Sequence, residues 1–373
     1  MIVDPTSDQE LFRETTERYL REHVPVGEVR RLRDDPAGFE PDCWRRGADL
    51  GWTSLLVPED QGGGSISGDG LVDLTLLAHE FGRHAAPGPL VPVNIAAATL
   101  SRATHGADDA VLGELLAGTA TVAWCVAEPP PHDRLGDIAV EVKTDGADVV
   151  IDGIKRPVES AGQAGHLLVT GRTGGGPTQV LVPVDTPGVT VAPMHTVDLT
   201  RRFAAVTFED VRLPATYVVG EVGSADRQVE HQLRLAAILS CAEAVGAMQA
   251  AFDMTVEWAF DRYSFGRPLA SYQALKHRFA DMKTWLEGAH AVTDAAAESP
   301  DDQRLVRAAK AFVGDYGSEL LQDCVQIHGG IGVTYEHDLH LFLRRHTVNR
   351  ALYGTPADHR QLLADLERKV DAA

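Results

Sequence analysis

The longest apolar stretch of the chain runs from Leu235 to Phe252, where nearly every residue is small or apolar. This length is well beyond that of a strand, so the pattern predicts a helix buried on most of its faces. Glu243 is the only charged residue in the stretch. Because an ionised carboxylate is costly to bury alone, Glu243 must be neutral, paired with a cation or used in chemistry.

Helical patterns also fill the start of the chain. Residues 7–24 place apolar side chains on one face of an amphipathic helix, and helical patterns return at residues 71–83 and 93–104. The glycines at residues 62–64 lack the following Lys-Ser/Thr pair of a phosphate-binding loop, so a tight turn is expected there. We expect a helical domain over residues 1–120.

The pattern changes after residue 120. Over residues 121–222, short Val-rich runs alternate with Asp-Gly, Gly-Gly and Pro-Gly turns, which is typical of a small antiparallel β domain. Over residues 223–373 the helical period returns. With the 235–252 helix, three further apolar stripes predict a four-helix bundle, at residues 275–292, 305–327 and 339–352. The predicted fold class is therefore α+β and multidomain: an N-terminal helical domain, a middle antiparallel β domain and a C-terminal four-helix bundle.

Composition and charge exclude several classes of protein. The 373 residues are 44% apolar, and the formal net charge is -20. The clustered Lys and Arg that contact nucleic-acid phosphates are absent, so no nucleic-acid binding is expected. The four cysteines are far apart without a CxxC pair and the N-terminus is acidic, which favours a cytoplasmic protein with reduced thiols. A membrane span is a weak alternative for the apolar run, and no histidine spacing predicts a metal site.

Three separated motifs occur in one order along the chain: LVPEDQGGG at residues 56–64, RYSFGRPLASYQ at residues 262–273 and QIHGGIGVTYEHDLHLFLRRH at residues 326–346. In these motifs the chain resembles the acyl-CoA dehydrogenase family of flavoproteins. The resemblance implies FAD as cofactor and α,β-dehydrogenation of an acyl-CoA thioester. In that reaction a carboxylate removes the α-proton while a hydride leaves for the flavin. It also implies an electron-transfer flavoprotein as the electron acceptor and an oligomeric protein.

The resemblance also implies which residues bind FAD. Arg262 corresponds to an arginine that reaches across a dimer interface to the FAD pyrophosphate, with Phe265 and Gln273 beside it. A guanidinium suits that role because it offers forked donors and a permanent charge; the alternative for Arg262 is an ordinary surface salt bridge. Gln326 corresponds to the contact with the adenosine side, and Gly330 allows close backbone approach. The remaining expected cofactor contacts are Trp124, Val126, Ala127 and Thr355.

The catalytic base departs from the family pattern. The family most often carries it in a Y-E-G-T motif, where this chain has Tyr353 in place of the glutamate, and the alternative position corresponds to Ala236. A phenol is a poor base at neutral pH. Glu243 lies two helical turns beyond Ala236 on nearly the same face, and is therefore the candidate catalytic base. The alternative is a structural ion pair of Glu243 with Arg344 or Arg345.

The β domain departs from the pattern as well. Pro157 stands where the family has a tryptophan facing the flavin, and Glu159 stands where a threonine donates to it. The loop after Glu128 reads PPPHDRLG instead of a Gly- and Ser-rich turn. These changes predict weaker flavin contact from this subunit.

Two functions follow from these observations. The first is an FAD-dependent acyl-CoA dehydrogenase that uses Glu243 as the base and acts on a bulky or branched acyl thioester. The second is a non-catalytic or FAD-sharing subunit of a mixed oligomer, which gives Arg262 and Gln326 to a shared FAD while a related subunit supplies the base.

Overall fold

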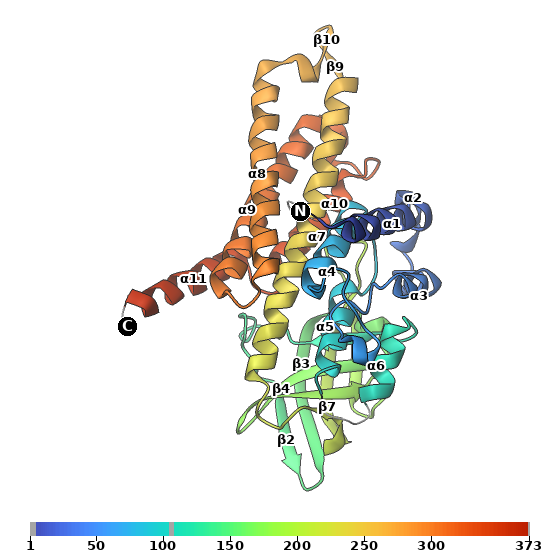
Figure 1. Cartoon of the computed structure of the whole chain (residues 1–373), viewed down its shortest axis with the longest axis vertical. Coiled ribbons are helices and arrows are strands. Elements are labelled where there is room, and N and C mark those ends of the chain that lie inside the picture. The colour runs from blue at the N-terminus through green and yellow to red at the C-terminus, as the bar shows by residue number, and fades with distance from the viewer. Residues whose placement is uncertain (1–4, 104–107, 372–373) are drawn as a thin grey trace.

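The computed structural model describes residues 5–103 and 108–371 (Figure 1). N-terminal helices pack against one side of a long central helix, a β domain lies at one end of that helix, and further long helices run beside it (Figure 1). The N-terminal helices are α1 (Ser7–His23), α2 (Val26–Leu32), α3 (Pro41–Asp49), α4 (Gly70–Arg83), α5 (Leu90–Leu100) and α6 (Asp108–Leu116).

The middle domain is one eight-stranded sheet in the order β6-β7-β3-β2-β4-β5-β8, with β1 paired to β4. Most neighbours are antiparallel, as predicted, but β1 and β2 both run parallel to β4, so the sheet is mixed. The strands are β1 (Val122–Cys125), β2 (Glu141–Asp145), β3 (Asp148–Glu159), β4 (His166–Thr173), β5 (Gly176–Pro183), β6 (Val189–Met194), β7 (Phe203–Pro214) and β8 (Val218–Val219).

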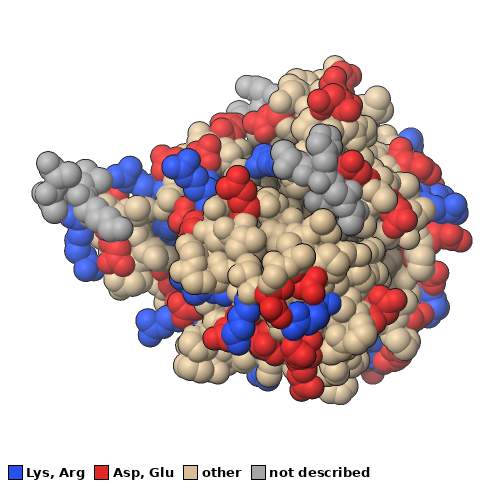
Figure 2. All heavy atoms as spheres, turned by 90° about the horizontal axis from the view of Figure 1, so that it is seen from below, with Lys and Arg blue, Asp and Glu red and all other residues tan. Residues whose placement is uncertain are grey.

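The ladder between the long strands β3 and β7 is interrupted. Its register shifts at Gly153, where φ is +137°. A side chain is disfavoured there both by this backbone conformation and by Val140, whose Cγ2 lies 2.8 Å from the position of an added Cβ. Seen from below, acidic and basic side chains are interspersed over the visible face, and basic side chains do not form a continuous area on it (Figure 2).

The C-terminal helices are α7 (Asp226–Asp261), α8 (Gln273–Glu298), α9 (Gln303–His328), α10 (Leu339–Ala351) and α11 (Pro356–Asp371). The first four form the predicted bundle, and α11 projects away from it (Figure 1). The predicted buried helix lies within α7, which is long and apolar enough to cross a membrane. Its most apolar window is 89% buried inside the protein, as in the core helix of a globular fold.

Two glycines let α4 and α7 pack with their backbones in contact. A Cβ added at Gly246 would lie 1.9 Å from the carbonyl oxygen of His79, and a Cβ at Gly82 would lie 1.9 Å from that of Glu243. Only glycine fits at either position. This close approach fixes the buried part of α7, including Glu243, against the N-terminal domain.

Candidate functional site

A cleft of about 270 Å³ lies between the β domain and the start of α7. Trp124, Val126 and Ala127 reach it from β1 and the residues that follow, and Thr355 reaches it from the segment before α11. Four of the predicted cofactor contacts therefore line one cavity. The cleft is also lined by Pro157 and Glu159 of β3, Leu233 of α7, and Leu135 of the loop after Glu128.

An aromatic pair closes one side of this cleft. The rings of Trp124 and Tyr353 are stacked, with centroids 5.7 Å apart and planes 26° apart. Burial raises the pKa of Tyr353, and the neighbouring Glu159 raises it further. The phenol in place of the family's glutamate is thus still further from acting as a base at neutral pH.

Glu159 brings a carboxylate to the cleft, but this carboxylate is paired. Arg201 binds both of its oxygens, with Nε 2.7 Å from Oε1 and Nη2 on Oε2. Both side chains are buried. Burial raises the pKa of Glu159 although Arg201 opposes the shift. A forked guanidinium on both oxygens leaves Glu159 little freedom to turn toward a ligand.

Glu243 lies in the same network and not in the cleft. Its Oε1 accepts from Nη1 of Arg345 at 2.5 Å, and its Oε2 accepts from Nη1 of Arg201 at 3.2 Å and from Nδ2 of Asn349 at 2.8 Å. The position of Glu243 therefore disagrees with its candidate role as the catalytic base. Two guanidiniums neutralise Glu243, and it does not line the cavity. The ion-pair alternative with Arg345 is the one the structure contains, whereas Arg344 binds the carbonyl of Val197.

The network connects all three parts of the chain. Arg345 of α10 also binds Asp198 of the β domain at 2.8 Å and the carbonyl of Ala86 of the N-terminal domain at 3.0 Å. Asp198 and Arg345 are both almost fully buried. Asp198, Glu159, Glu243 and the two arginines thus bridge the domains with paired charges. Removing one member of such a network leaves an uncompensated buried charge.

The other predicted cofactor contacts lie at the opposite end of the molecule. Arg262 caps α7, and Phe265 lies at the tip of the β9–β10 hairpin (Tyr263–Ser264 and Arg267–Pro268), far from the β domain (Figure 1). Phe265 is 97% exposed with φ +50°, a strained value for an aromatic residue. Among the described residues the Arg262 side chain has no hydrogen-bond or ion-pair partner, which counts against the surface salt-bridge alternative.

Gln326 and Gly330 lie near this same end. Both are exposed where α9 ends, and the stacking of Trp258 of α7 on His328 of α9, at 5.2 Å, holds the two helix ends together. Gln273 begins α8 nearby and its amide contacts His277. The five residues Arg262, Phe265, Gln273, Gln326 and Gly330 are called the tip residues below.

One chain does not bring the cleft and the tip residues together. Leu233 lines the cleft and Arg262 caps the far end of α7, so at 1.5 Å per residue the two lie about 40 Å apart. A single dinucleotide does not span that distance. A complete site built from both groups therefore requires a second chain whose cleft meets this tip.

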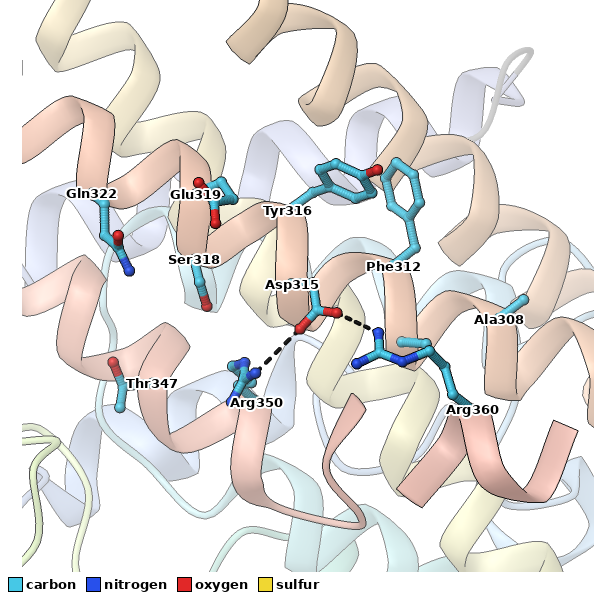
Figure 3. Close-up of a pocket in the computed structure, with 11 residues that line it drawn as sticks. Ala308, Phe312, Asp315, Tyr316, Ser318, Glu319, Gln322, Thr347, Arg350 and Arg360 are labelled. Atoms are coloured by element: carbon cyan, nitrogen blue, oxygen red, sulfur yellow. Dashed lines mark hydrogen bonds and ion pairs between the residues drawn. The ribbon is translucent and has the colours of Figure 1, made fainter. Parts of the chain in front are cut away.

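A larger open hollow of about 830 Å³ lies elsewhere, between α9, α10 and α11 (Figure 3). Asp315 lines this hollow and forms ion pairs with Arg350 and Arg360 (Figure 3). The aromatic rings of Phe312 and Tyr316 lie next to these ion pairs. It shares no lining residue with the cleft. Asp315 is neutralised on both oxygens, so among the residues that line the hollow the exposed Glu319 is the carboxylate without an ion-pair partner in the described part of the chain.

Comparison with known proteins identifies the family. Residues 6–119 match the model of the acyl-CoA dehydrogenase N-terminal domain, and residues 227–366 match that of the C-terminal domain. The acyl-CoA dehydrogenase IpdE2 of Mycobacterium tuberculosis is 30% identical, over 99% of both chains. This chain belongs to the acyl-CoA dehydrogenase family. The family consists of flavin-dependent oxidoreductases that act on CH–CH groups, and FAD is expected for its members.

Solved structures of acyl-CoA dehydrogenases share the fold. Butyryl-CoA dehydrogenase from Megasphaera elsdenii superposes with a TM-score of 0.87 at 22% identity, covering 98% of this chain and 99% of that one. A protein described as a variant of the Tcur3481-Tcur3483 steroid ACAD gives a TM-score of 0.88 at 24% identity, with the same coverage. The helical, β and helical domain order predicted from the sequence is thus confirmed.

Sequence reasoning missed the partners that neutralise Glu243 and Glu159. Arg201 stands in a loop before β7, and Asn349 lies on α10, so neither is near either glutamate in sequence. No periodic pattern marks a contact between residues 42 or more positions apart. The one available signal was the rule that a buried carboxylate needs a cation, which pointed to Arg345 but not to Arg201.

Proposed function

We propose that this chain is an FAD-sharing subunit of a mixed acyl-CoA dehydrogenase oligomer, in which a related partner supplies the catalytic base. The observation that carries the proposal is the pairing of the buried carboxylates Glu128, Glu159 and Glu243 in and near its own cleft, together with the guanidinium of Arg262 at the exposed tip, which has no partner among the described residues. The chain has the tip residues, which would reach a partner's cofactor. It lacks the glutamate of the Y-E-G-T motif, which performs the proton transfer in the family, and has Tyr353 in its place.

The residues of the chain's own cleft do not fit a flavin. Small-molecule sites span about 300–1,000 Å³, whereas this cleft of about 270 Å³ would have to hold a tricyclic ring and a thioester together. The Trp124–Tyr353 stack and the paired Glu159 occupy the space next to the strand that faces the ring in the family. No reaction step is assigned to this cleft.

The tip residues do fit FAD. Arg262 offers a permanently charged, forked donor set that no acceptor occupies within residues 5–103 and 108–371, which suits a pyrophosphate. Phe265 exposes an apolar ring beside it, and the exposed amide of Gln326 is free to bind adenosine. When bound, FAD supplies the hydride acceptor. This chain's part is to neutralise the pyrophosphate and to hold the adenosine end while the ring lies in the partner's cleft.

The substrate of the assembled enzyme is an acyl-CoA thioester, for which we propose a bulky or branched acyl group. One structural neighbour is described as a variant of a steroid ACAD whose name, Tcur3481-Tcur3483, joins two designations. Another structural neighbour is described as an electron transferring flavoprotein of Acidaminococcus fermentans, which supports such a protein as the electron acceptor. The distribution of residues favours the mixed oligomer over a homo-oligomer, because each tip of a homo-oligomer would meet a cleft that holds the Trp124–Tyr353 stack and the paired Glu159.

Flavin stoichiometry tests the proposal. The chain is purified alone and after co-expression with a related chain from the same source that carries glutamate in the Y-E-G-T motif. We expect a colourless protein alone, and one FAD per two chains with thioester-dependent flavin reduction in the complex. A yellow protein with one FAD per chain that reduces its own flavin with an acyl-CoA would overturn the proposal.

A further inference from the structure

A second hollow of about 170 Å³ lies directly beside the cleft. Leu135, Gly136 and Leu233 line both cavities, so the loop after Glu128 forms the wall between them. The rest of the second hollow is built by α7, α9 and α11. It is smaller than the usual range for a whole ligand, and its size suits one functional group of a ligand.

Three buried nitrogen atoms around this hollow have no hydrogen-bond partner among the described residues: Nε of Arg234, Nε of Arg307 and Nδ1 of His359. His359 is only 2% exposed. Buried polar groups are nearly always hydrogen-bonded, so three unpaired nitrogens on residues that line one cavity indicate a missing polar partner.

The two arginines are poorly neutralised. Arg307 has no carboxylate within ion-pair distance in the described part of the chain, and its Nη2 donates only to the amide oxygen of Gln303 at 2.8 Å. Burial lowers the pKa of Arg307, and the nearby Arg234 lowers it further against the opposing charge of Glu230. Arg234 binds Asp301 at 3.0 Å, but that carboxylate is 88% exposed, and such pairs are weak.

We propose that this hollow is a binding site for an anionic oxygen group, a phosphate or a carboxylate carried by a small molecule. Two guanidinium groups on adjacent helices line the hollow and have unpaired N–H donors for such oxygens, and charge-assisted hydrogen bonds of this kind are the strong ones. The proposal goes beyond FAD sharing and does not depend on it, since the site lies within one chain and away from the tip residues.

His359 should make the hollow discriminate between a phosphate and a carboxylate. Its Nε2 donates to the carbonyl of Tyr353 at 2.9 Å, so in the neutral ring Nδ1 is an acceptor that needs a donor. Inorganic phosphate keeps at least one P–OH group at neutral pH and supplies that donor. A carboxylate does not, so phosphate should bind more tightly than acetate.

The test measures binding of inorganic phosphate and of acetate to the full chain, by calorimetry and by thermal shift, with ionic strength held constant by sodium chloride. We expect saturable phosphate binding that weakens at least tenfold in Arg307→Gln and in Arg234→Gln. The matched control is Arg304→Gln, one helical turn away on α9, where the arginine is exposed and pairs with Glu367. That control should bind like the unchanged chain.

Other outcomes are equally decisive. Acetate binding as tight as phosphate binding, with the same dependence on Arg307, would assign a carboxylate as the source. Absence of saturable binding for both probes, or equal binding by Arg307→Gln and Arg304→Gln, overturns the proposal. If Arg307→Gln does not fold, Arg307→Lys keeps the charge but loses the fork and the Nε donor. Unweakened phosphate binding by Arg307→Lys and by Arg234→Gln then overturns it.

Discussion

Nη1 of Arg345 lies 2.5 Å from Oε1 of Glu243, and the arginine side chain is completely buried. The second oxygen of Glu243 is held by Arg201 and Asn349. A general base needs a lone pair that can reach the substrate proton. Glu243 has both oxygens engaged with cationic or amide donors, so its position is explained by the charges it neutralises.

Replacement of Glu243 therefore distinguishes a structural role of this carboxylate from a role as the catalytic base. In Glu243→Gln, two buried guanidiniums lose their shared carboxylate, and breaking a buried pair costs about 3–5 kcal/mol. We expect a clear loss of thermal stability of the assembled enzyme, while activity per folded complex stays within a few fold. Asp198→Asn removes another carboxylate of the same network and serves as the control, with a similar stability loss. A large loss of activity at unchanged stability, seen only in Glu243→Gln, would restore the role of Glu243 as base.

Arg262 should control the flavin content of the assembled enzyme. In Arg262→Ala the forked donor for the pyrophosphate is lost, and we expect FAD affinity to fall at least tenfold with little effect on unfolding. Arg267→Ala is the matched control: it lies in the same exposed hairpin, but its guanidinium stacks on Tyr272 at 3.9 Å. Flavin absorbance per mole of complex measures both variants. Equal flavin retention by the two would show that Arg262 does not bind the cofactor.

The sequence predicted what depends on local pattern. The apolar run containing Glu243 is the buried part of α7, and the hydrophobic stripes that follow it predicted the other three helices of the bundle. The motifs also named the residues that the structure divides between the cleft and the tip, and their role in binding FAD stays a prediction. The single sequence did not specify how β1 pairs with β4, because that pairing joins strands about 40 residues apart. Likewise, the contact of Arg201 with Glu159 depends on the pairing of β3 with β7, and its contact with Glu243 depends on the packing of the β domain against α7.

Glu128 should hold the loop that separates the two cavities. Its carboxylate binds Nζ of buried Lys155 and accepts from the backbone N–H groups of Ala139 and Val140, which follow the loop. In Glu128→Ala these donors and the buried ammonium lose their partner, so we expect about 3–5 kcal/mol less stability in urea unfolding. Trypsin cleavage after Arg134 in the loop should also become faster.

The control for this variant is Glu141→Ala in β2. Glu141 pairs with Lys143, and both side chains are 61% exposed. Exposed pairs contribute about 0–1 kcal/mol, so this variant should unfold almost like the unchanged chain. Equal stability losses for Glu128→Ala and Glu141→Ala would contradict the proposed anchoring.

Two buried histidines should make the protein sensitive to acid. Burial lowers the pKa of His346 and of His359 to about 4 each, whereas an unfolded histidine has a pKa of about 6.5. The unfolded chain therefore binds protons first, and the stability present above pH about 6.5 falls as the pH is lowered toward 4. Each histidine contributes about 1.4 kcal/mol per pH unit in this window.

Urea unfolding at several pH values measures that slope. In His346→Gln one titrating group is removed, so the slope between pH about 6 and 4 should become shallower by about 1.4 kcal/mol per unit. The exposed His132, in the loop after Glu128, gives the control variant His132→Gln, which should keep the full slope. The Gln variant at position 346 is expected to be less stable at pH 7, because the His346 ring packs against Gly317 and lies beside Ser318. A slope equal to that of His132→Gln would show that proton uptake by His346 does not drive acid unfolding.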